Sequence, residues 1–168
     1  MPVCLKESSP VARKEHKCMY CGCIIPVGEK YSRDTLIYDG TVYDWVAHED
    51  CCTVANLLDM FDYCDDDGLG TDSFQEYLDE YLNDHYRDPE IDDLPEHIAK
   101  MSRIEQVRMI IADWDKPHIK LPRLKSELYR LKAWCGSRKP SEYEIKRVAE
   151  LESEIAALEK ELNAKESK

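Results

Sequence analysis

Alternating apolar and polar positions in the first third of the chain predict a short β-hairpin. The stretches LIY and TVYDWV flank Asp39 and Gly40, and an Asp-Gly pair in this setting is a strong signal for a two-residue turn. After His48 the apolar residues recur at helical spacing, so a helix is expected to follow the hairpin directly. Its apolar positions are Val54, Leu57, Leu58 and Phe61.

The middle of the chain predicts an amphipathic helix. Ser73 and Glu76 have the spacing of a capping box, in which two side chains bond to the first free N–H groups of a helix. One face of this predicted helix is apolar and the opposite face is acidic. The apolar positions are Phe74, Tyr77, Leu78, Tyr81 and Leu82.

From Leu94 onward the pattern is almost entirely helical. A first helix is expected over about residues 95–114, and Pro117 interrupts it. Pro122 suits the first position of a second helix, because a proline there loses no helical hydrogen bond. This second helix is expected to end near Cys135. Its apolar stripe is Leu121, Leu124, Leu128, Leu131 and Cys135.

A last helix is predicted to follow a second capping box, formed by Ser141 and Glu144. Its apolar residues repeat as in a coiled coil over about two and a half heptads. Residues 145–162 could therefore fold back as a helical hairpin, or pair with a second copy as a homodimer. The short connection GSRKP favours the hairpin. The repeating positions are Ile145, Val148, Leu151, Ile155, Leu158 and Leu162.

Two pairs of candidate metal ligands enclose the predicted hairpin. Cys18 and Cys21 form a C-x2-C pair before it, here called the knuckle. Gly22, which directly follows Cys21, relieves the steric crowding of this tight turn. His48 and Cys51 form an H-x2-C pair after it, at the start of the predicted helix. Side chains three positions apart on a helical turn point the same way, as binding of a single ion requires.

The order of knuckle, hairpin and ligand-bearing helix is the plan of a treble-clef zinc finger. The stretch C-x2-C-G-x-x-I-P-x-G-E-x-Y with a later H-x2-C resembles the LIM-like and PARP-like members of that class. It is also similar to small zinc-finger proteins of phages and bacteria. The resemblance covers about residues 15–62. It implies that the metal ligands are Cys18, Cys21, His48 and Cys51.

Three thiolates and one imidazole favour tetrahedral zinc, and four protein ligands leave no position open for water. The expected cofactor is therefore one structural Zn²⁺. Cys23, which lies two residues after the knuckle, is an alternative fourth ligand in place of His48. Cys52 points away from Cys51 on the helix and is expected to be buried as a small hydrophobic side chain.

The charge of the chain is unevenly distributed. The chain carries −12 overall, and residues 59–97 alone carry −14. An acidic chain is a poor general ligand for nucleic acid, because attraction to phosphate dominates such binding. The acidic, tyrosine-rich helix is either a solvated surface or a docking face for a basic protein partner. The candidate partner-binding residues are Asp79, Glu80 and Asp84.

One basic segment supports a different hypothesis. Residues 116–139 carry +7, with Tyr129 and Trp134 among the basic side chains, so contact with nucleic acid is the second choice. Alternatively, these bases pair with the acidic segment of the same chain or of a second copy. Arg13, Lys14 and Lys17 beside the knuckle, together with Arg123, Arg130 and Lys132, are the candidate nucleic-acid contacts.

Established catalytic motifs of the common hydrolase, nucleotide-binding, metalloprotease and deaminase types do not occur in the sequence, so we expect a protein that is not an enzyme. No apolar stretch is long enough to cross a membrane, and the N-terminus lacks the apolar core of a secretion signal. A cytoplasmic location is expected, in the host cytoplasm if the protein is phage-encoded.

These patterns predict an α+β chain that is mostly helical, with a small N-terminal treble-clef finger followed by a helical, partly coiled-coil module. The expected divisions are a zinc-binding domain over residues 1–62, an acidic loop and helix over 63–97, and a helical module over 98–168. The favoured function is a non-catalytic interaction or regulatory protein that binds a host or partner protein. A nucleic-acid-binding regulator and a coiled-coil assembly protein are the alternatives.

Overall fold

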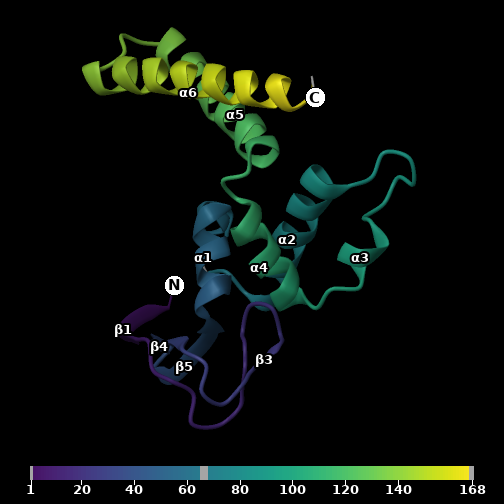
Figure 1. Ribbon diagram of the computed structural model, residues 1–168. Helices are drawn as coiled ribbons and strands as arrows, with labels where there is room; N and C mark the ends of the chain where they lie inside the picture. The colour runs from purple at the N-terminus through teal and green to yellow at the C-terminus, as the bar shows by residue number, and fades with distance from the viewer. Residues whose placement is uncertain (1, 65–67, 167–168) are drawn as a thin grey trace. The chain divides into compact units, whose positions relative to one another are not determined.

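Figure 1 shows the computed structural model of the chain, which describes residues 2–64 and 68–166. The described residues form a small α+β fold in which helices predominate and the sheets are short. The chain divides into two compact units, residues 1–111 and residues 112–168. None of the helices in the described ranges is long and apolar enough to cross a membrane.

The larger sheet of the first unit contains the predicted hairpin. β4 (Tyr31–Tyr38) and β5 (Thr41–His48) pair antiparallel. The residues between them, Asp39 and Gly40, have φ of 48° and 74°, as the two-residue turn that suits twisted strands requires. The hairpin prediction is therefore confirmed. β1 (Val3–Ser8) adds an exposed edge strand against β4, which the sequence pattern did not predict.

The first helix is shorter than the apolar pattern predicted. α1 (Glu49–Leu57) follows β5 directly, and a short 3₁₀ helix, η1 (Met60–Tyr63), comes after it. Asp59 between them has a φ of 50°, and this left-handed residue turns the chain away from the helix axis. Phe61 is consequently 47% exposed, so its predicted place on the buried stripe is wrong.

The amphipathic helix of the acidic segment is α2 (Thr71–Tyr86). Phe74, Leu78 and Leu82 are fully buried, which confirms these three positions of the predicted apolar face, whereas Tyr77 and Tyr81 are only half-buried. The predicted capping box at Ser73 is wrong, because the helix begins two residues earlier, at Thr71. The Thr71 hydroxyl instead donates to the Met19 carbonyl oxygen in the knuckle, and this bond fixes the start of α2.

The single helix expected over about residues 95–114 is divided in two. α3 (Glu96–Ala99) ends before Ser102, and α4 (Arg103–Asp113) begins after it. The Ser102 backbone N–H and hydroxyl both donate to Glu105, at 2.7 and 2.6 Å. This side-chain cap starts a new helix, and it accounts for the break that apolar spacing alone did not reveal.

The second unit is built from α5 (Pro117–Gly136) and α6 (Glu142–Glu166). Pro117 lies in the first turn of α5, so the prediction that Pro122 begins the helix is wrong: Pro122 lies inside it. The predicted capping box at the start of α6 is confirmed, because the Ser141 hydroxyl donates to Glu144 at 2.8 Å and the Glu144 N–H donates back at 3.3 Å.

α5 and α6 pack against each other as the predicted helical hairpin. Leu124, Leu151 and Ile155 are buried between the two helices. Ion pairs join the helices along the outside, among them Lys120–Glu154 at 2.5 Å. The partly buried residues around this core are Leu121, Leu128, Leu131 and Leu158. The homodimer through residues 145–162 stays a prediction.

Candidate metal centre

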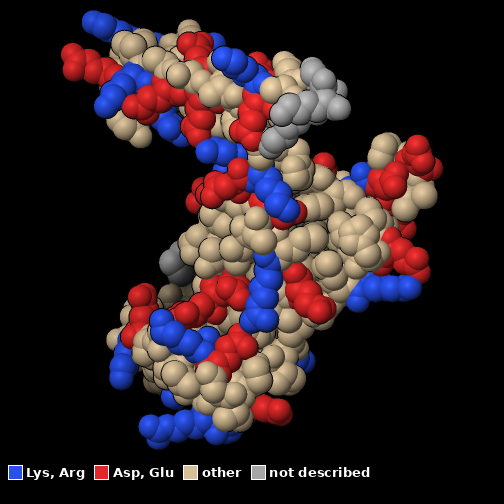
Figure 2. Space-filling model, viewed as in Figure 1, with Lys and Arg blue, Asp and Glu red and all other residues tan. Residues whose placement is uncertain are grey.

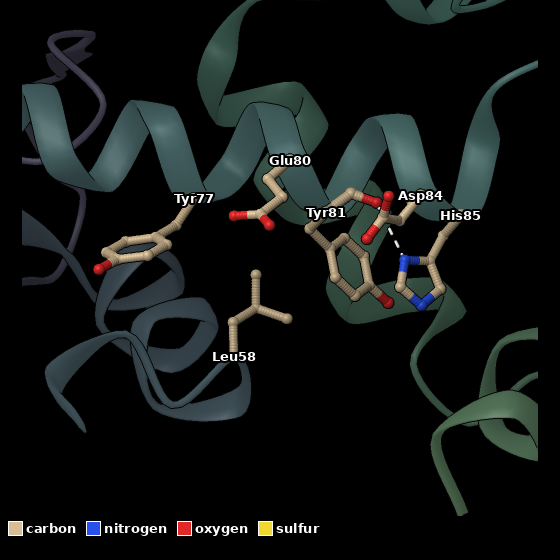
Figure 3. A pocket seen from close by; sticks show the side chains of 6 residues that line it. All are labelled: Leu58, Tyr77, Glu80, Tyr81, Asp84 and His85. Atoms are coloured by element: carbon tan, nitrogen blue, oxygen red, sulfur yellow. Dashed lines mark hydrogen bonds between the residues drawn. The ribbon is translucent and has the colours of Figure 1, made fainter. Parts of the chain in front are cut away.

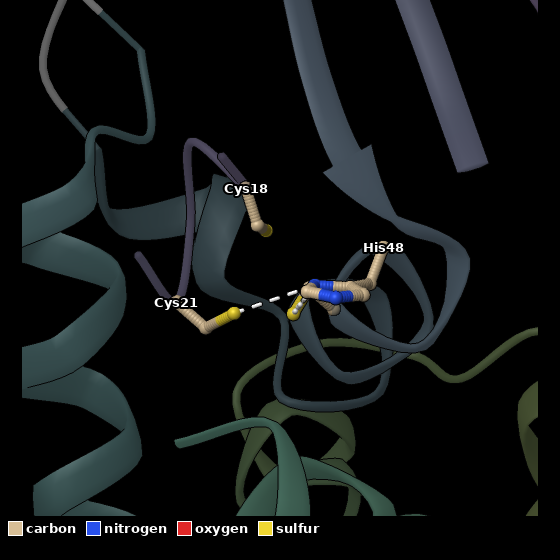
Figure 4. A group of neighbouring side chains, drawn as sticks. Cys18, Cys21 and His48 are labelled. Atoms are coloured by element: carbon tan, nitrogen blue, oxygen red, sulfur yellow. Dashed lines mark hydrogen bonds between the residues drawn. The ribbon is translucent and has the colours of Figure 1, made fainter. Parts of the chain in front are cut away.

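Four buried side chains from three elements of the first unit come together at one point. Cys18 and Cys21 come from the knuckle, His48 from the end of β5, and Cys51 from the first turn of α1. Their nitrogen and sulfur atoms all lie within 4.8 Å of one another. Figure 4 shows Cys18, Cys21 and His48 directed toward a common centre. The structure thus unites the four side chains that the resemblance implied.

Backbone hydrogen bonds fold the knuckle so that both of its thiols face the same side. The short strands β2 (His16–Lys17) and β3 (Ile24–Ile25) pair on either side of it. The Cys18 N–H donates to the Cys23 carbonyl at 2.9 Å, and the Gly22 N–H donates to the Cys18 carbonyl at 3.0 Å. Gly22 has a φ of 72°, which glycine adopts without steric cost.

The separations within the cluster suit one tetrahedral ion. Zinc bonds of about 2.3 Å to sulfur and about 2.0–2.1 Å to nitrogen imply sulfur–nitrogen separations of about 3.6 Å across a tetrahedron. The Nδ1 atom of His48 lies 3.4 Å from Cys21 Sγ and 3.9 Å from Cys51 Sγ. The cluster is therefore geometrically suited to binding a single metal ion.

The other ring nitrogen of His48 is directed away from the thiols. Nε2 lies 3.3 Å from the carbonyl oxygen of Ile24 and 3.9 Å from a carboxylate oxygen of Glu29. A carbonyl oxygen only accepts hydrogen bonds, so this contact favours the tautomer with hydrogen on Nε2. That tautomer leaves Nδ1 free to donate its lone pair to a metal.

Within the cluster the three thiols influence one another's pKa values. Hydrogen bonds from Cys21 and Cys51 lower the pKa of Cys18. Donating to Cys18 raises the pKa of Cys21 to about 12 and raises that of Cys51 as well. Burial lowers the pKa of His48, but Cys18, Glu29 and the Ile24 carbonyl together raise it by more, so the net shift is upward. The cluster therefore favours ionisation of Cys18 over ionisation of the other two thiols.

The remaining cysteines near the centre have other environments. Cys23 Sγ lies 3.8 Å from the backbone oxygen of Cys21, and it is absent from the group of four among the described residues. Cys52 is half-buried beside Ser32 and Asp34 in a polar hollow. Burial raises the pKa of the Cys52 thiol to about 11.

Aromatic packing fixes the knuckle to the rest of the first unit. Tyr20 lies between the two knuckle cysteines in sequence, and its ring stacks on Phe74 of α2 at 5.1 Å. The same ring meets Trp45 of β5 edge-on at 5.5 Å. Burial raises the pKa of Tyr20, so its side chain stays neutral as part of the core. The metal cluster and α2 therefore share one core.

An arginine from α4 also reaches the surroundings of the centre. Arg108 donates to Asp50 in α1 at 2.8 Å and to Glu29 at 3.0 Å. Glu29 is the carboxylate beside His48 Nε2, and Asp50 is the residue before Cys51. Arg108 thus connects α4 to α1, which carries Cys51, and to the carboxylate beside His48.

The predicted acidic face is divided by the structure. Asp79 accepts two hydrogen bonds from Arg103 of α4, at 2.5 and 2.8 Å, so it holds two helices together. Glu80 and Asp84 line a groove on another side of α2. Only these two of the three predicted partner-binding carboxylates share a surface.

The predicted nucleic-acid contacts of the second unit are largely engaged within that unit. The Arg123 guanidinium lies 3.6 Å from the centre of the Trp114 ring, and Lys132 pairs with Glu152 of α6 at 2.6 Å. Arg130 lines a shallow surface hollow with Trp134. Figure 2 shows acidic and basic side chains interspersed on the α5–α6 hairpin. Bases of α5 thus pair with acids of α6, and pairing with the acidic segment of the same chain or of a second copy stays a prediction.

A basic hollow beside the knuckle was only partly foreseen. Arg13 and Lys14 were noted in the sequence, but Arg33 and Tyr31 of β4 line the same hollow of about 680 Å³. The Tyr31 ring lies 4.9 Å from that of His16. Strand pairing brings these residues together from separate segments, so sequence spacing carried no signal for the complete set.

Comparison with known protein families, with curated proteins and with solved structures found no match to this chain. Its function is therefore inferred from its own residues and their geometry.

Proposed function

We propose that the N-terminal part of the chain is a treble-clef zinc finger that holds one structural zinc ion. The support is the buried group of Cys18, Cys21, His48 and Cys51, delivered by a knuckle, a strand end and a first helical turn. Three sulfurs and one nitrogen are the donor set that zinc favours. Bound zinc would add stability that the small three-stranded sheet lacks by itself.

We further propose that the protein is a non-catalytic interaction protein. Four protein ligands complete the tetrahedron and leave no position for a reactive water or substrate. The metal would then serve to hold the surfaces that surround it. The Tyr20–Phe74 stack connects the metal-binding knuckle to the acidic helix α2, so metal binding would stabilise that helix in place.

The proposed partner is a protein with a basic surface. Residues 59–97 carry −14 with a single basic side chain, Arg87. A negative electrostatic potential over a surface attracts positively charged molecules and orients them as they approach. An acidic surface of this kind could occupy the nucleic-acid-binding face of its partner.

The test is a pull-down with tagged, zinc-loaded protein from lysate, with and without nuclease. We expect a discrete protein partner that survives nuclease and is lost with the Glu80→Gln, Asp84→Asn double variant. The Asp72→Asn, Glu76→Gln variant serves as the control, because it removes the same charge from exposed positions of α2 outside the groove. Recovery of nucleic acid, with bound protein lost after nuclease, would contradict the proposal.

The basic hollow beside the knuckle favours a second candidate function, contact with nucleic acid. Arg13, Lys14 and Arg33 line it with two aromatic rings and without a carboxylate, although Arg33 is paired with Asp44 at 2.6 Å. Binding through this hollow would weaken steeply with salt. It would also fall in an Arg13→Ala, Lys14→Ala variant, as measured with a fluorescent single-stranded oligonucleotide.

A further inference from the structure

A groove of about 380 Å³ lies between α2 and the end of α1. Figure 3 shows its walls: five side chains of α2 lie along one side, and Leu58 faces them from the residue that ends α1. The α2 residues are spaced three and four apart, so they share one face of the helix. They are Tyr77, Glu80, Tyr81, Asp84 and His85.

The aromatic part of this groove is held in a fixed arrangement. The rings of Tyr81 and His85 stack with centroids 4.1 Å apart and planes 19° from parallel. His85 Nδ1 lies 3.0 Å from the Tyr81 carbonyl oxygen, a contact in which the imidazole must be the donor. The stacked pair therefore forms one wall without needing a ligand to order it.

The two carboxylates of the groove differ from their neighbour Asp79. Asp79 is neutralised by Arg103, whereas within the described chain Glu80 and Asp84 form no ion pair. Glu80 is exposed, and its carboxylate lies between the two tyrosines on the side that faces Leu58 (Figure 3). Two negative groups thus stand beside aromatic and aliphatic surfaces, and no residue in the described ranges forms an ion pair with either.

We propose that this groove binds a lysine or arginine side chain from a basic segment of the partner protein. The inference rests on the proposed function, which supplies a basic protein partner. The cation would lie against a tyrosine face and between Glu80 and Asp84, combining cation–π attraction with charge-assisted hydrogen bonds. Its aliphatic stem would pack on Leu58 and Tyr77.

The test uses fluorescein-labelled hexa-arginine and hexa-lysine peptides, with fluorescence anisotropy on the full zinc-loaded chain. We expect saturable binding, and a loss of at least about 10-fold in the Glu80→Gln, Asp84→Asn variant. The matched control is Asp72→Asn, Glu76→Gln, which removes the same charge from exposed positions of α2 outside the groove. Its affinity should fall by less than about 3-fold.

A second variant tests the aromatic wall apart from charge. Tyr81→Leu keeps an apolar side chain and the net charge, and should weaken both peptides by about 3-fold or more. Circular dichroism and zinc content verify that each variant is folded. A stronger response to hexa-arginine than to hexa-lysine would identify the preferred cation.

Three results would overturn the groove assignment. They are no binding of either peptide, no change in the Glu80→Gln, Asp84→Asn variant, and equal losses in this variant and its control. If the peptides fail while a protein partner is still recovered from lysate, the groove assignment is wrong and the interaction function stands. If a single-stranded oligonucleotide is bound and the peptides are not, both are wrong.

Discussion

The Nε2 atom of His48 lies 3.3 Å from the carbonyl oxygen of Ile24. This contact turns the opposite nitrogen, Nδ1, toward the sulfurs of Cys21 and Cys51. A backbone carbonyl in β3 thus selects which nitrogen is available for the metal, as hydrogen-bond partners behind metal-binding histidines do.

The first prediction concerns the tautomer of His48. On zinc binding, the Nδ1 resonance of His48 should move to a metal-bound shift while Nε2 keeps its hydrogen, as measured by long-range ¹H–¹⁵N correlation NMR. His48→Cys should retain zinc as a four-thiolate site, and His48→Ala should lose most of it. A metal-bound Nε2 would contradict the geometry.

The second prediction concerns protons released by metal binding. The raised pKa values of Cys21, about 12, and of Cys51 keep both as thiols near neutral pH, while the lowered pKa of Cys18 makes it a thiolate. Zinc must displace about two protons from these thiols, so its affinity should rise with pH. Below the raised pKa of His48 a third proton should be released.

Calorimetry in buffers of different ionisation enthalpy directly measures the number of protons released when zinc binds. A zinc affinity that stays constant between about pH 6 and 8 would be inconsistent with two displaced protons.

The sequence carried most of the information about the metal cluster and less about its surroundings. Ligand spacing and the Asp39–Gly40 turn are local signals, and both led to correct geometry. The break at Ser102 and the end of α1 at Leu58 depend on caps and on one left-handed residue. Apolar periodicity does not register such features.

Pairings between distant segments were equally invisible in the sequence. In the sequence Asp79 groups with Glu80 and Asp84 because all three are acidic. In the structure Asp79 instead forms an ion pair with Arg103 of α4. The groove itself needs Leu58 from the end of α1. Only the packing of α2 in the first unit, which includes its stack on Tyr20, brings these parts into place.

The third prediction concerns the stack between the knuckle and α2. Phe74 is fully buried and packs on Tyr20, so Phe74→Ala should lower the free energy of unfolding by about 3–5 kcal/mol. Phe61→Ala removes the same side chain from a half-exposed position and should cost no more than about 1 kcal/mol. Urea unfolding of the zinc-loaded protein provides the comparison, and equal costs would contradict the predicted core.

The fourth prediction concerns the helical hairpin of the second unit. Leu151 is fully buried against α5, so Leu151→Ala should destabilise the hairpin by about 2–5 kcal/mol. Ile145→Ala, at a position 57% exposed, should change stability by less than about 0.5 kcal/mol. Hydrogen exchange of the α5 and α6 amides reports the difference. If Leu151→Ala instead halves the molecular mass of the protein in solution, the apolar stripe of α6 joins two chains.

The most direct test of the account is the metal content of protein purified without chelator. We expect about one zinc per chain in the wild type and in Cys23→Ser, and less than about 0.2 in Cys18→Ser and in Cys51→Ser. Wild-type protein with less than about 0.2 zinc per chain and all its thiols free would contradict the four-ligand site and the zinc-finger assignment with it.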